Sequence, residues 1–375
     1  MKPSTSSIFS VVTSEQFKQM ALSVFNFQFA NNQVYRNYIT ALKVNTDKII
    51  DLEQIPFMPI EFFKTQIIIS DLTSENREIR IKGQEASGKK QEVRSKNQET
   101  IGKKQEIRSI NQETRNKNQE SSDKNQSAVF TSSGSIQSKH YVSDISLYEQ
   151  SYLKGFELFY GNIEDYCVLA LLPSYLDREG SSLIYMAEDL INKSKHAASG
   201  FYLNNYNELI LKLKELELQK KKTILLGVTY ALLDLIEIQK FQLKHTIIME
   251  TGGMKGKRTE MVREELHAIL CEGFGVQEIH SEYGMTELLS QAYSTGNGVF
   301  NCPPWMKVLI RDTNDPFSFL PHNKTGGINV IDLANINSCS FIATQDLGKS
   351  FSDMSFEVLG RFDNSDIRGC NLLVG

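Results

Sequence analysis

The sequence predicts an α/β fold with a largely parallel sheet, followed by a β-rich C-terminal part. Short apolar runs alternate with stretches of helical periodicity, which is typical of parallel strands covered on both faces. After Pro303 the pattern changes to short strands and turns. The 375 residues are enough for one large α/β domain or two smaller ones.

The first predicted element is an amphipathic helix from residue 14 to about residue 30. Thr13 and Gln16 have the spacing of a capping box, in which each side chain bonds the backbone N–H of the other residue. Apolar residues then recur at helical spacing and form the face expected to enter the core: Phe17, Met20, Ala21, Val24 and Phe25.

The following elements alternate between strand and helix. Four apolar runs rich in β-branched residues are predicted strands: 66–69, 166–172, 223–228 and 246–249. Helical patterns cover 181–193, 206–219 and 259–272, and we expect Gly273 to end the last of these helices. A further strand is predicted at 276–279, and the C-terminal strands at 307–310, 327–332, 340–343 and 355–359.

Residues 83–126 interrupt this alternation with a seven-residue repeat. The dipeptide Gln-Glu occurs six times at this period, but apolar residues are sparse in the repeats and form no regular pair of positions, so no coiled-coil seam exists. A segment this polar buries too little apolar area to offset its ordering entropy. We predict a disordered or loosely helical insertion, with a solvated single helix or a partner-binding segment as the alternatives.

Composition and charge narrow the function classes. The formal net charge of −4 gives no global field for nucleic acid or an anionic membrane. The five cysteines are scattered without a C-x-x-C pair, which fits reduced thiols better than disulfides or a zinc site. No apolar run approaches the length of a membrane span. These features predict a cytoplasmic protein that binds neither nucleic acid nor a membrane.

The segment from Tyr283 to Glu287 carries the clearest chemical signal. An aromatic ring, Tyr283, can stack on a purine, and Gly284 lets the backbone approach a phosphate. Thr286 adds a hydroxyl, and the Glu287 carboxylate can hold Mg²⁺. This combination predicts nucleotide binding. The nearby His280 is more simply a packed core histidine.

Three other segments match this reading. A Ser/Gly loop with a following lysine can wrap phosphates, although a polar turn is the simpler alternative: Ser132, Ser133, Gly134 and Lys139. Gly252 and Gly253 follow a predicted strand, where ligands of α/β sheets bind, although a flexible basic loop is equally expected. Asp346 can accept from ribose hydroxyls, and Arg361 can contact phosphate or ribose.

In this order the segments resemble the motifs of the adenylate-forming (ANL) superfamily. Within it, the chain outside the insertion is most similar to the LuxE-type acyl-protein synthetases, which are related to phenylacetate-CoA ligases. The resemblance to this family rests on Pro-Ile-Glu-Phe-Phe-Lys at 59–64, Thr-Ser-Ser-Gly at 131–134 with Ser-Lys-His at 138–140, Leu-Gly-Val-Thr-Tyr-Ala-Leu-Leu-Asp at 226–234, Glu-Thr-Gly-Gly-Met-Lys-Gly at 250–256, and Arg-Gly-Cys at 368–370.

The resemblance implies an ATP- and Mg²⁺-dependent long-chain-fatty-acid protein ligase. Such an enzyme forms an acyl-adenylate and passes the acyl group to a cysteine near its C-terminus, here Cys370, from which a partner protein takes it. It implies catalytic roles for Cys370, Glu287 and Lys139. The alternatives are a buried, inert Cys370, a non-catalytic acyl- or nucleotide-binding member of the superfamily, and an acyltransferase that uses no ATP.

The sequence departs from the superfamily pattern at three places. The phosphate loop is a few residues short after Gly134, which bears on its grip on phosphate. The ribose motif reads Thr-Gln-Asp in place of Thr-Gly-Asp, keeping Asp346. The chain stops soon after the hinge that contains Arg361, so we expect the mobile C-terminal domain to be missing.

Four segments are therefore expected. Residues 1–82 form the N-terminal part of the α/β domain, and 83–126 the repeat insertion. Residues 127–305 form the core α/β nucleotide-binding region, and 306–375 the β-rich C-terminal subdomain ending at the hinge.

Overall fold

The computed structural model describes residues 2–70, 127–132, 136–173, 180–203, 205–253, 258–259 and 261–362. The predicted repeat insertion at 83–126 lies outside the described residues. Among the described helices, none is long and apolar enough to cross a membrane.

A six-stranded, mostly parallel sheet confirms the predicted α/β core. Its order is β5 (Gly200–Phe201), β4 (Cys167–Leu171), β6 (Thr223–Val228), β7 (Thr246–Thr251), β8 (His280–Tyr283) and β9 (Ala292–Ser294). Only β9 runs antiparallel to its neighbour. Every residue of β4 and β6 is buried, as expected of strands covered on both faces.

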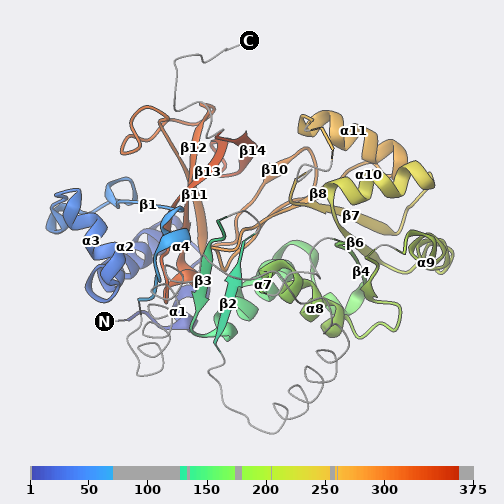
Figure 1. The fold of residues 1–375 in the computed structure, drawn as a ribbon, viewed down its shortest axis with the longest axis horizontal. Helices are drawn as coiled ribbons and strands as arrows, with labels where there is room; N and C mark the ends of the chain where they lie inside the picture. The colour runs from blue at the N-terminus through green and yellow to red at the C-terminus, as the bar shows by residue number, and fades with distance from the viewer. Residues whose placement is uncertain are drawn as a thin grey trace, which may run out of the picture.

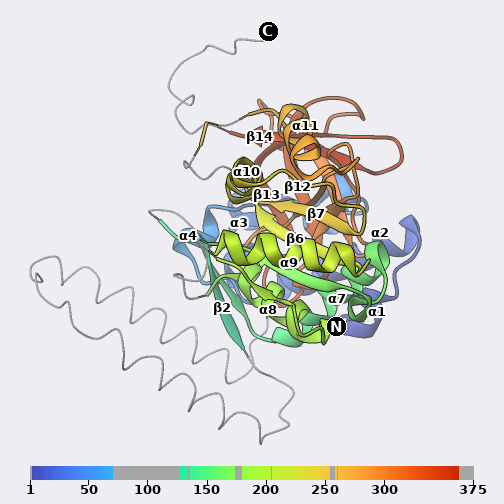
Figure 2. The same cartoon turned by 90° about the vertical axis from the view of Figure 1, so that its right-hand side faces the viewer.

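Helices cover the two faces of this sheet (Figure 1). The helices α10 (Thr229–Ile238) and α11 (Arg263–Phe274) lie on one side, and α7 (Ile145–Tyr160) and α8 (Ser182–Ser194) on the other, an arrangement that the rotated view repeats (Figure 2). Helix α9 (Tyr206–Leu218) joins β5 to β6.

Helix α11 differs from its prediction, 259–272, at both ends. It begins at Arg263 rather than residue 259, and it runs through Gly273 to end at Phe274. The cap is Gly275, whose φ of +67° favours glycine. Gly273 serves a different purpose, because a Cβ there would come within 2.5 Å of Ile236 Cδ1 on α10. Close packing of the two helices, not helix termination, explains this glycine.

Two predicted strands are wrong. The strand expected at 276–279 lies at His280–Tyr283, where it pairs with the carboxyl half of β7, because residues 276–279 serve to connect α11 to the sheet edge. Residues 66–70 form no strand; their buried contacts go to single backbone and side-chain groups, such as Ser70 N to Asn337 O at 2.7 Å. An apolar run alone does not separate a strand from a buried irregular segment.

A second sheet confirms the β-rich C-terminal part. Its antiparallel order is β10 (Val299–Phe300), β14 (Phe356–Arg361), β13 (Phe341–Ser350), β12 (Gly326–Asp332) and β11 (Met306–Arg311), and β1 (Met58–Pro59) adds to β13 in parallel. Because β1 and β10 come from before residue 306, this sheet also holds segments from earlier in the chain.

The N-terminal elements pack beside this second sheet. Thr13 and Gln16 form the predicted capping box at the start of α2 (Ser14–Asn31). The other described N-terminal elements are α1 (Thr5–Phe9), η1 (Thr46–Lys48), η2 (Leu52–Gln54), α3 (Gln33–Ala41) and α4 (Phe62–Thr65). Later in the chain come the antiparallel pair β2 (Ala128–Thr131) and β3 (Lys139–Val142), and the 3₁₀ helices η3 (Ile163–Asp165) and η4 (Leu333–Asn335).

Candidate functional site

Asp346, Tyr283 and Arg361 meet where the two large sheets approach each other. The Tyr283 hydroxyl at the end of β8 donates to Asp346 Oδ2 at 2.8 Å, and Arg361 Nε on β14 donates to Asp346 Oδ1 at 2.9 Å. Both are charge-assisted contacts to a buried carboxylate. Three of the residues predicted to bind nucleotide are thus brought together from three strands.

The Tyr283 ring is largely enclosed by the protein. It packs edge-on against Phe300 and Phe356, with ring centroids 5.9 and 5.5 Å away. Burial, together with the Asp346 carboxylate, raises the pKa of the hydroxyl well above its ordinary value, so it stays a donor. In this arrangement Tyr283 orients Asp346.

Glu287 lies next to this group on the turn that follows β8. Burial raises the pKa of its carboxyl, while a hydrogen bond with the Ser138 hydroxyl and the positive charges of Arg361 and Lys64 act in the opposite direction. Only 5% of Glu287 is exposed. A carboxylate with cationic neighbours and little water is suited to a hard cation shared with phosphate oxygens.

Two buried side chains, His140 and Asn335, contact the backbone of the turn at residues 286–287. His140 Nδ1 lies 2.8 Å from Thr286 O, and its Nε2 lies 3.0 Å from Asn335 Oδ1. The Asn335 amide in turn donates to Glu287 O at 2.8 Å. The positions of Thr286 and Glu287 therefore depend on β3 and η4, which are distant in the sequence.

The expected phosphate loop is anchored at its two ends. Ser132 N donates to Ser138 O at 3.1 Å, and Ser138 N donates to the Ser132 hydroxyl at 2.8 Å. The predicted residues Ser133 and Gly134, between these anchors, lie outside the described residues. The second anchor lies beside Glu287, because the Ser138 hydroxyl acts on that carboxylate.

Lys139 does not join this cluster. Its residue is exposed, whereas Ser138 and His140 on either side are buried. Neighbouring residues of a strand point to opposite faces, so the Lys139 side chain leaves from the face opposite to the one that carries Ser138.

Gly252 and Gly253 lie at the same sheet edge as Tyr283. In the register of β7 and β8, Thr251 pairs with Glu282, so Gly252 is level with Tyr283. Both glycines are exposed, and Gly252 has a φ of +70°, which favours glycine. Gly284 is also exposed, and a Cβ there would come within 2.3 Å of the Glu282 carboxylate.

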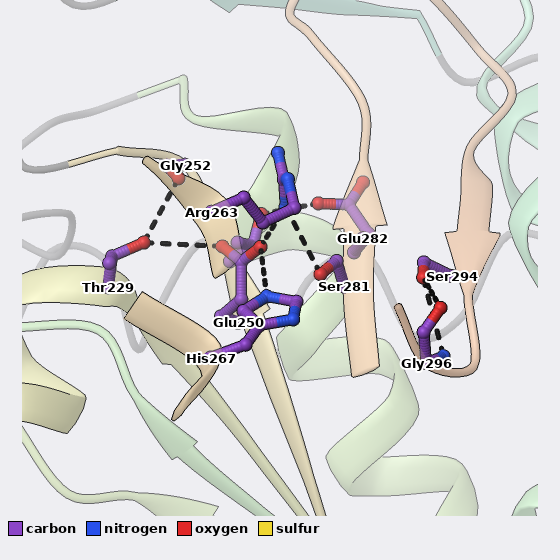
Figure 3. A network of polar contacts seen from close by, with 10 residues as sticks. Thr229, Glu250, Gly252, Arg263, His267, Ser281, Glu282, Ser294 and Gly296 are labelled. Atoms are coloured by element: carbon purple, nitrogen blue, oxygen red, sulfur yellow. Dashed lines mark hydrogen bonds and ion pairs between the residues drawn. The ribbon is translucent and has the colours of Figure 1, made fainter. Parts of the chain in front are cut away.

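Figure 3 shows a charged network directly below the Gly252 loop. Arg263 Nη1, at the start of α11, donates to Glu250 Oε1 at 2.5 Å and lies 3.3 Å from Ser281 Oγ. Thr229 Oγ1 is 3.2 Å from both Glu250 Oε2 and Gly252 O, and His267 Nε2 is 3.7 Å from Glu250 Oε1. These contacts tie the end of β7 to α10, α11 and β8.

Several site residues were not found from the sequence. Gln345 Nε2 donates to Glu61 Oε1 at 2.5 Å, which joins the 59–64 segment to the residue before Asp346. Arg311 donates to the Ile328 and Thr344 carbonyls, and Thr344 precedes Gln345 on β13. The sequence pointed to Glu61 only through the 59–64 segment, which is one of those that carry the family resemblance. No motif pointed to Asn335 or Arg311.

The residues present fit a Mg²⁺ ion shared with a nucleotide. The described residues contain no cluster of three or more metal-ligating side chains, so a cage made of protein alone is not found there. Mg²⁺ is commonly held by one or two carboxylates together with substrate phosphates, and Glu287 supplies one carboxylate beside the anchored loop. The predicted acyl-carrying Cys370 lies outside the described residues.

No family model and no curated protein matches the sequence. Among solved structures, an open conformation of 2-hydroxyisobutyryl-CoA ligase in complex with 2-HIB-AMP and CoA aligns with a TM-score of 0.58 and 10% identity, over 93% of this chain and 70% of that chain.

Two further structures are similar over a shorter part. ATP-bound MatB from Rhodopseudomonas palustris aligns with a TM-score of 0.47 and 18% identity, over 62% of this chain and 48% of that chain. MenE from Bacillus subtilis, in complex with ATP and magnesium, gives 0.42 and 17%, over 62% and 49%. The chain thus spans about half the length of these two proteins. The longer alignment to the 2-hydroxyisobutyryl-CoA ligase shows that the chain has the adenylate-forming enzyme fold.

Proposed function

We propose that this chain activates a carboxylic acid with ATP, forming an acyl-adenylate, and that it is an acyl-protein synthetase of the LuxE type. The observation that carries the proposal is the meeting of Tyr283, Asp346 and Arg361 beside Glu287. Two carboxylates, a guanidinium and an anchored Ser/Gly loop provide the groups that a nucleotide triphosphate requires.

In the first step, an oxygen of the substrate carboxylate attacks the α-phosphorus of ATP. A new phosphorus–oxygen bond forms, the bond to the β-phosphate breaks, and pyrophosphate leaves. Asp346 would hold the ribose hydroxyls, and Gly252, Gly253 and Gly284 would admit the base and phosphates closely. Mg²⁺ bound at Glu287 would neutralise charge on the phosphate oxygens.

In the second step, the Cys370 thiolate attacks the acyl carbonyl of the adenylate. A thioester forms and AMP leaves with the electron pair of the broken bond. We propose a long-chain fatty acid as the substrate and a protein as the final acyl acceptor. This part rests on the sequence resemblance, since Cys370 lies outside the described residues.

Exchange of radiolabelled pyrophosphate into ATP tests the first step. We expect exchange that depends on Mg²⁺ and a carboxylic acid, and loss of at least about a hundredfold in rate in Asp346→Asn. Asp47→Asn, an exposed aspartate in η1, is the matched control and should retain the rate. ATP binding without exchange, over a series of acids from acetate to palmitate, would instead indicate a nucleotide-binding protein without turnover.

Labelling with a radioactive fatty acid tests the second step. The protein should acquire a label that neutral hydroxylamine releases, only when ATP is present. Cys370→Ser should keep pyrophosphate exchange and lose the hydroxylamine-labile label. Retention of that label in Cys370→Ser would refute transfer through this cysteine, and label acquired from acyl donors without ATP would favour a simple acyltransferase.

A further inference from the structure

The short helix α4 brings the 59–64 segment against the candidate site. Strand β1, just before it, pairs with β13 near Ala343, and Ile60 N donates to Ala343 O at 3.0 Å. Glu61 accepts from Gln345, the residue next to Asp346. On the other side, the Phe63 ring packs edge-on against the His140 ring at 5.5 Å. Figure 1 shows α4 beside β3.

Lys64 follows directly after Phe63 and is half-buried. Its positive charge is close enough to Glu287 to act on the pKa of that carboxyl. Among the residues that the structure describes, none forms a hydrogen bond or ion pair with the Lys64 ammonium. Lys64 is therefore a cation close to Glu287 that pairs with no other described residue.

We propose that Lys64 is a phosphate-binding catalytic residue, which contacts the triphosphate of the nucleotide from the α4 side. The inference rests on the proposed ATP-dependent function and extends it to a residue outside the expected phosphate loop. Lys64 supplies the positive charge that Lys139 does not bring to this face, since Lys139 leaves β3 on the opposite side.

The charges around Glu287 support this assignment. Glu287 and Asp346 are two carboxylates, and Arg361 is bound to Asp346 through its Nε. An incoming triphosphate brings several negative charges next to these carboxylates. Lys64 is a cation near Glu287 that pairs with none of the described residues. An ammonium acts as a mobile point charge, which suits it to phosphate oxygens.

Comparison of ATP with AMP as ligands tests the inference, with binding measured by isothermal titration calorimetry on the full chain. In Lys64→Ala, affinity for Mg-ATP should fall about tenfold or more, whereas affinity for AMP, which lacks the β- and γ-phosphates, should change less than about twofold. Lys64→Arg keeps the charge and should recover part of the ATP affinity. Lys48→Ala, an exposed lysine of η1, is the control and should bind both nucleotides normally.

The outcomes separate this inference from the function on which it rests. If the unchanged protein binds Mg-ATP and exchanges pyrophosphate while Lys64→Ala does both equally well, the role of Lys64 is refuted and the proposed function stands. An equal loss of ATP and AMP affinity in Lys64→Ala would show a structural effect and also refute it. An unchanged protein that binds neither nucleotide refutes both.

Discussion

His140 is the residue on which the hydrogen bonding of the 286–287 turn depends. Both ring nitrogens face oxygen atoms: the Thr286 carbonyl and the Asn335 side-chain oxygen. A neutral imidazole has one N–H, so it can donate to only one of them. Turning the Asn335 amide would satisfy the ring but would set its oxygen against Glu287 O. While the ring is neutral, one of these three contacts therefore sets two hydrogen-bond acceptors against each other.

Burial nevertheless keeps the ring neutral near pH 7, and this predicts a pH dependence of stability. Burial lowers the pKa of His140 from 6.5 to about 4, although the contacts with Thr286 and Asn335 act in the opposite direction. The unfolded chain then binds more protons than the folded chain between these pH values. The stability contributed by the neutral His140 ring is complete above pH 6.5. As the pH falls toward 4, the free energy of unfolding loses about 3 kcal/mol from this group.

Urea unfolding at pH 7.5, 6, 5 and 4.5 measures this loss against His140→Gln. The variant lacks the titrating ring, so its free energy of unfolding should fall less over the same interval, while the carboxylates contribute equally to both proteins. Parallel pH profiles for the two proteins would contradict a depressed pKa at His140.

At the residue scale, the sequence predicted four of the side chains that meet, but it did not predict what holds them. Tyr283, Glu287, Asp346 and Arg361 were all expected at one site, since each lies in a motif with a recognisable chemistry. His140 and Asn335 belong to no motif. Their role exists only because β3 and η4 pass beneath the turn, and the His140 and Asn335 side chains are 195 positions apart in the chain.

Two helices on one face of the parallel sheet depend on a single glycine for their contact. A Cβ at Gly273 of α11 would overlap Ile236 of α10, with the nearest atom at 2.5 Å. Gly273→Ala should lower the free energy of unfolding by about 1–3 kcal/mol, because the neighbouring side chain and backbone must move. Gly200→Ala in β5 is the control, as nothing lies within 4 Å of its added Cβ. Equal denaturation midpoints for the two variants would contradict this packing.

The Glu250–Arg263 pair predicts a larger effect where β7 meets α11. Glu250 is buried, and Arg263 Nη1 donates to it at 2.5 Å. Arg263→Met should cost about 3–5 kcal/mol, since it leaves a buried carboxylate without its cation. The exposed pair of Lys240 and Glu272 is the comparison, and Lys240→Met should change stability by less than about 1 kcal/mol. Calorimetric or urea unfolding of both variants measures the difference, and a similar small cost would show that Glu250 is solvated.

At the element scale, periodicity located most elements but misplaced those set by tertiary contacts. The fully buried strand at 223–228 was predicted with its observed bounds, because six apolar or β-branched residues in a row leave little choice. The strand predicted at 276–279 lies four residues later, because its position follows from pairing with β7. The predicted helix end at Gly273 is wrong because a packing glycine and a capping glycine look alike in a sequence.

For the whole molecule, the central fact is that the candidate site is shared by two sheets. Tyr283 comes from the parallel sheet, while Asp346 and Arg361 come from the antiparallel one. Glu61 reaches Gln345 over 284 positions of sequence. Contacts between residues so far apart in the sequence cannot be predicted from motif spacing, because they form only when the complete sheets come together. The resemblance to a known family predicted that these residues would meet at one site.

A ligand that binds groups from both sheets should stabilise the whole molecule rather than one part of it. A nucleotide bound only to the folded state adds RT ln(1 + [L]/Kd) to the free energy of unfolding, about 2.7 kcal/mol at one hundred times Kd. We therefore expect Mg-ATP to shift a single cooperative melting transition upward. In Asp346→Asn the shift should shrink strongly, because the acceptor between Tyr283 and Arg361 loses its charge; Asp47→Asn should keep the full shift. Differential scanning calorimetry with and without Mg-ATP decides the matter. A second, unshifted transition would show that the nucleotide contacts only one of the two sheets.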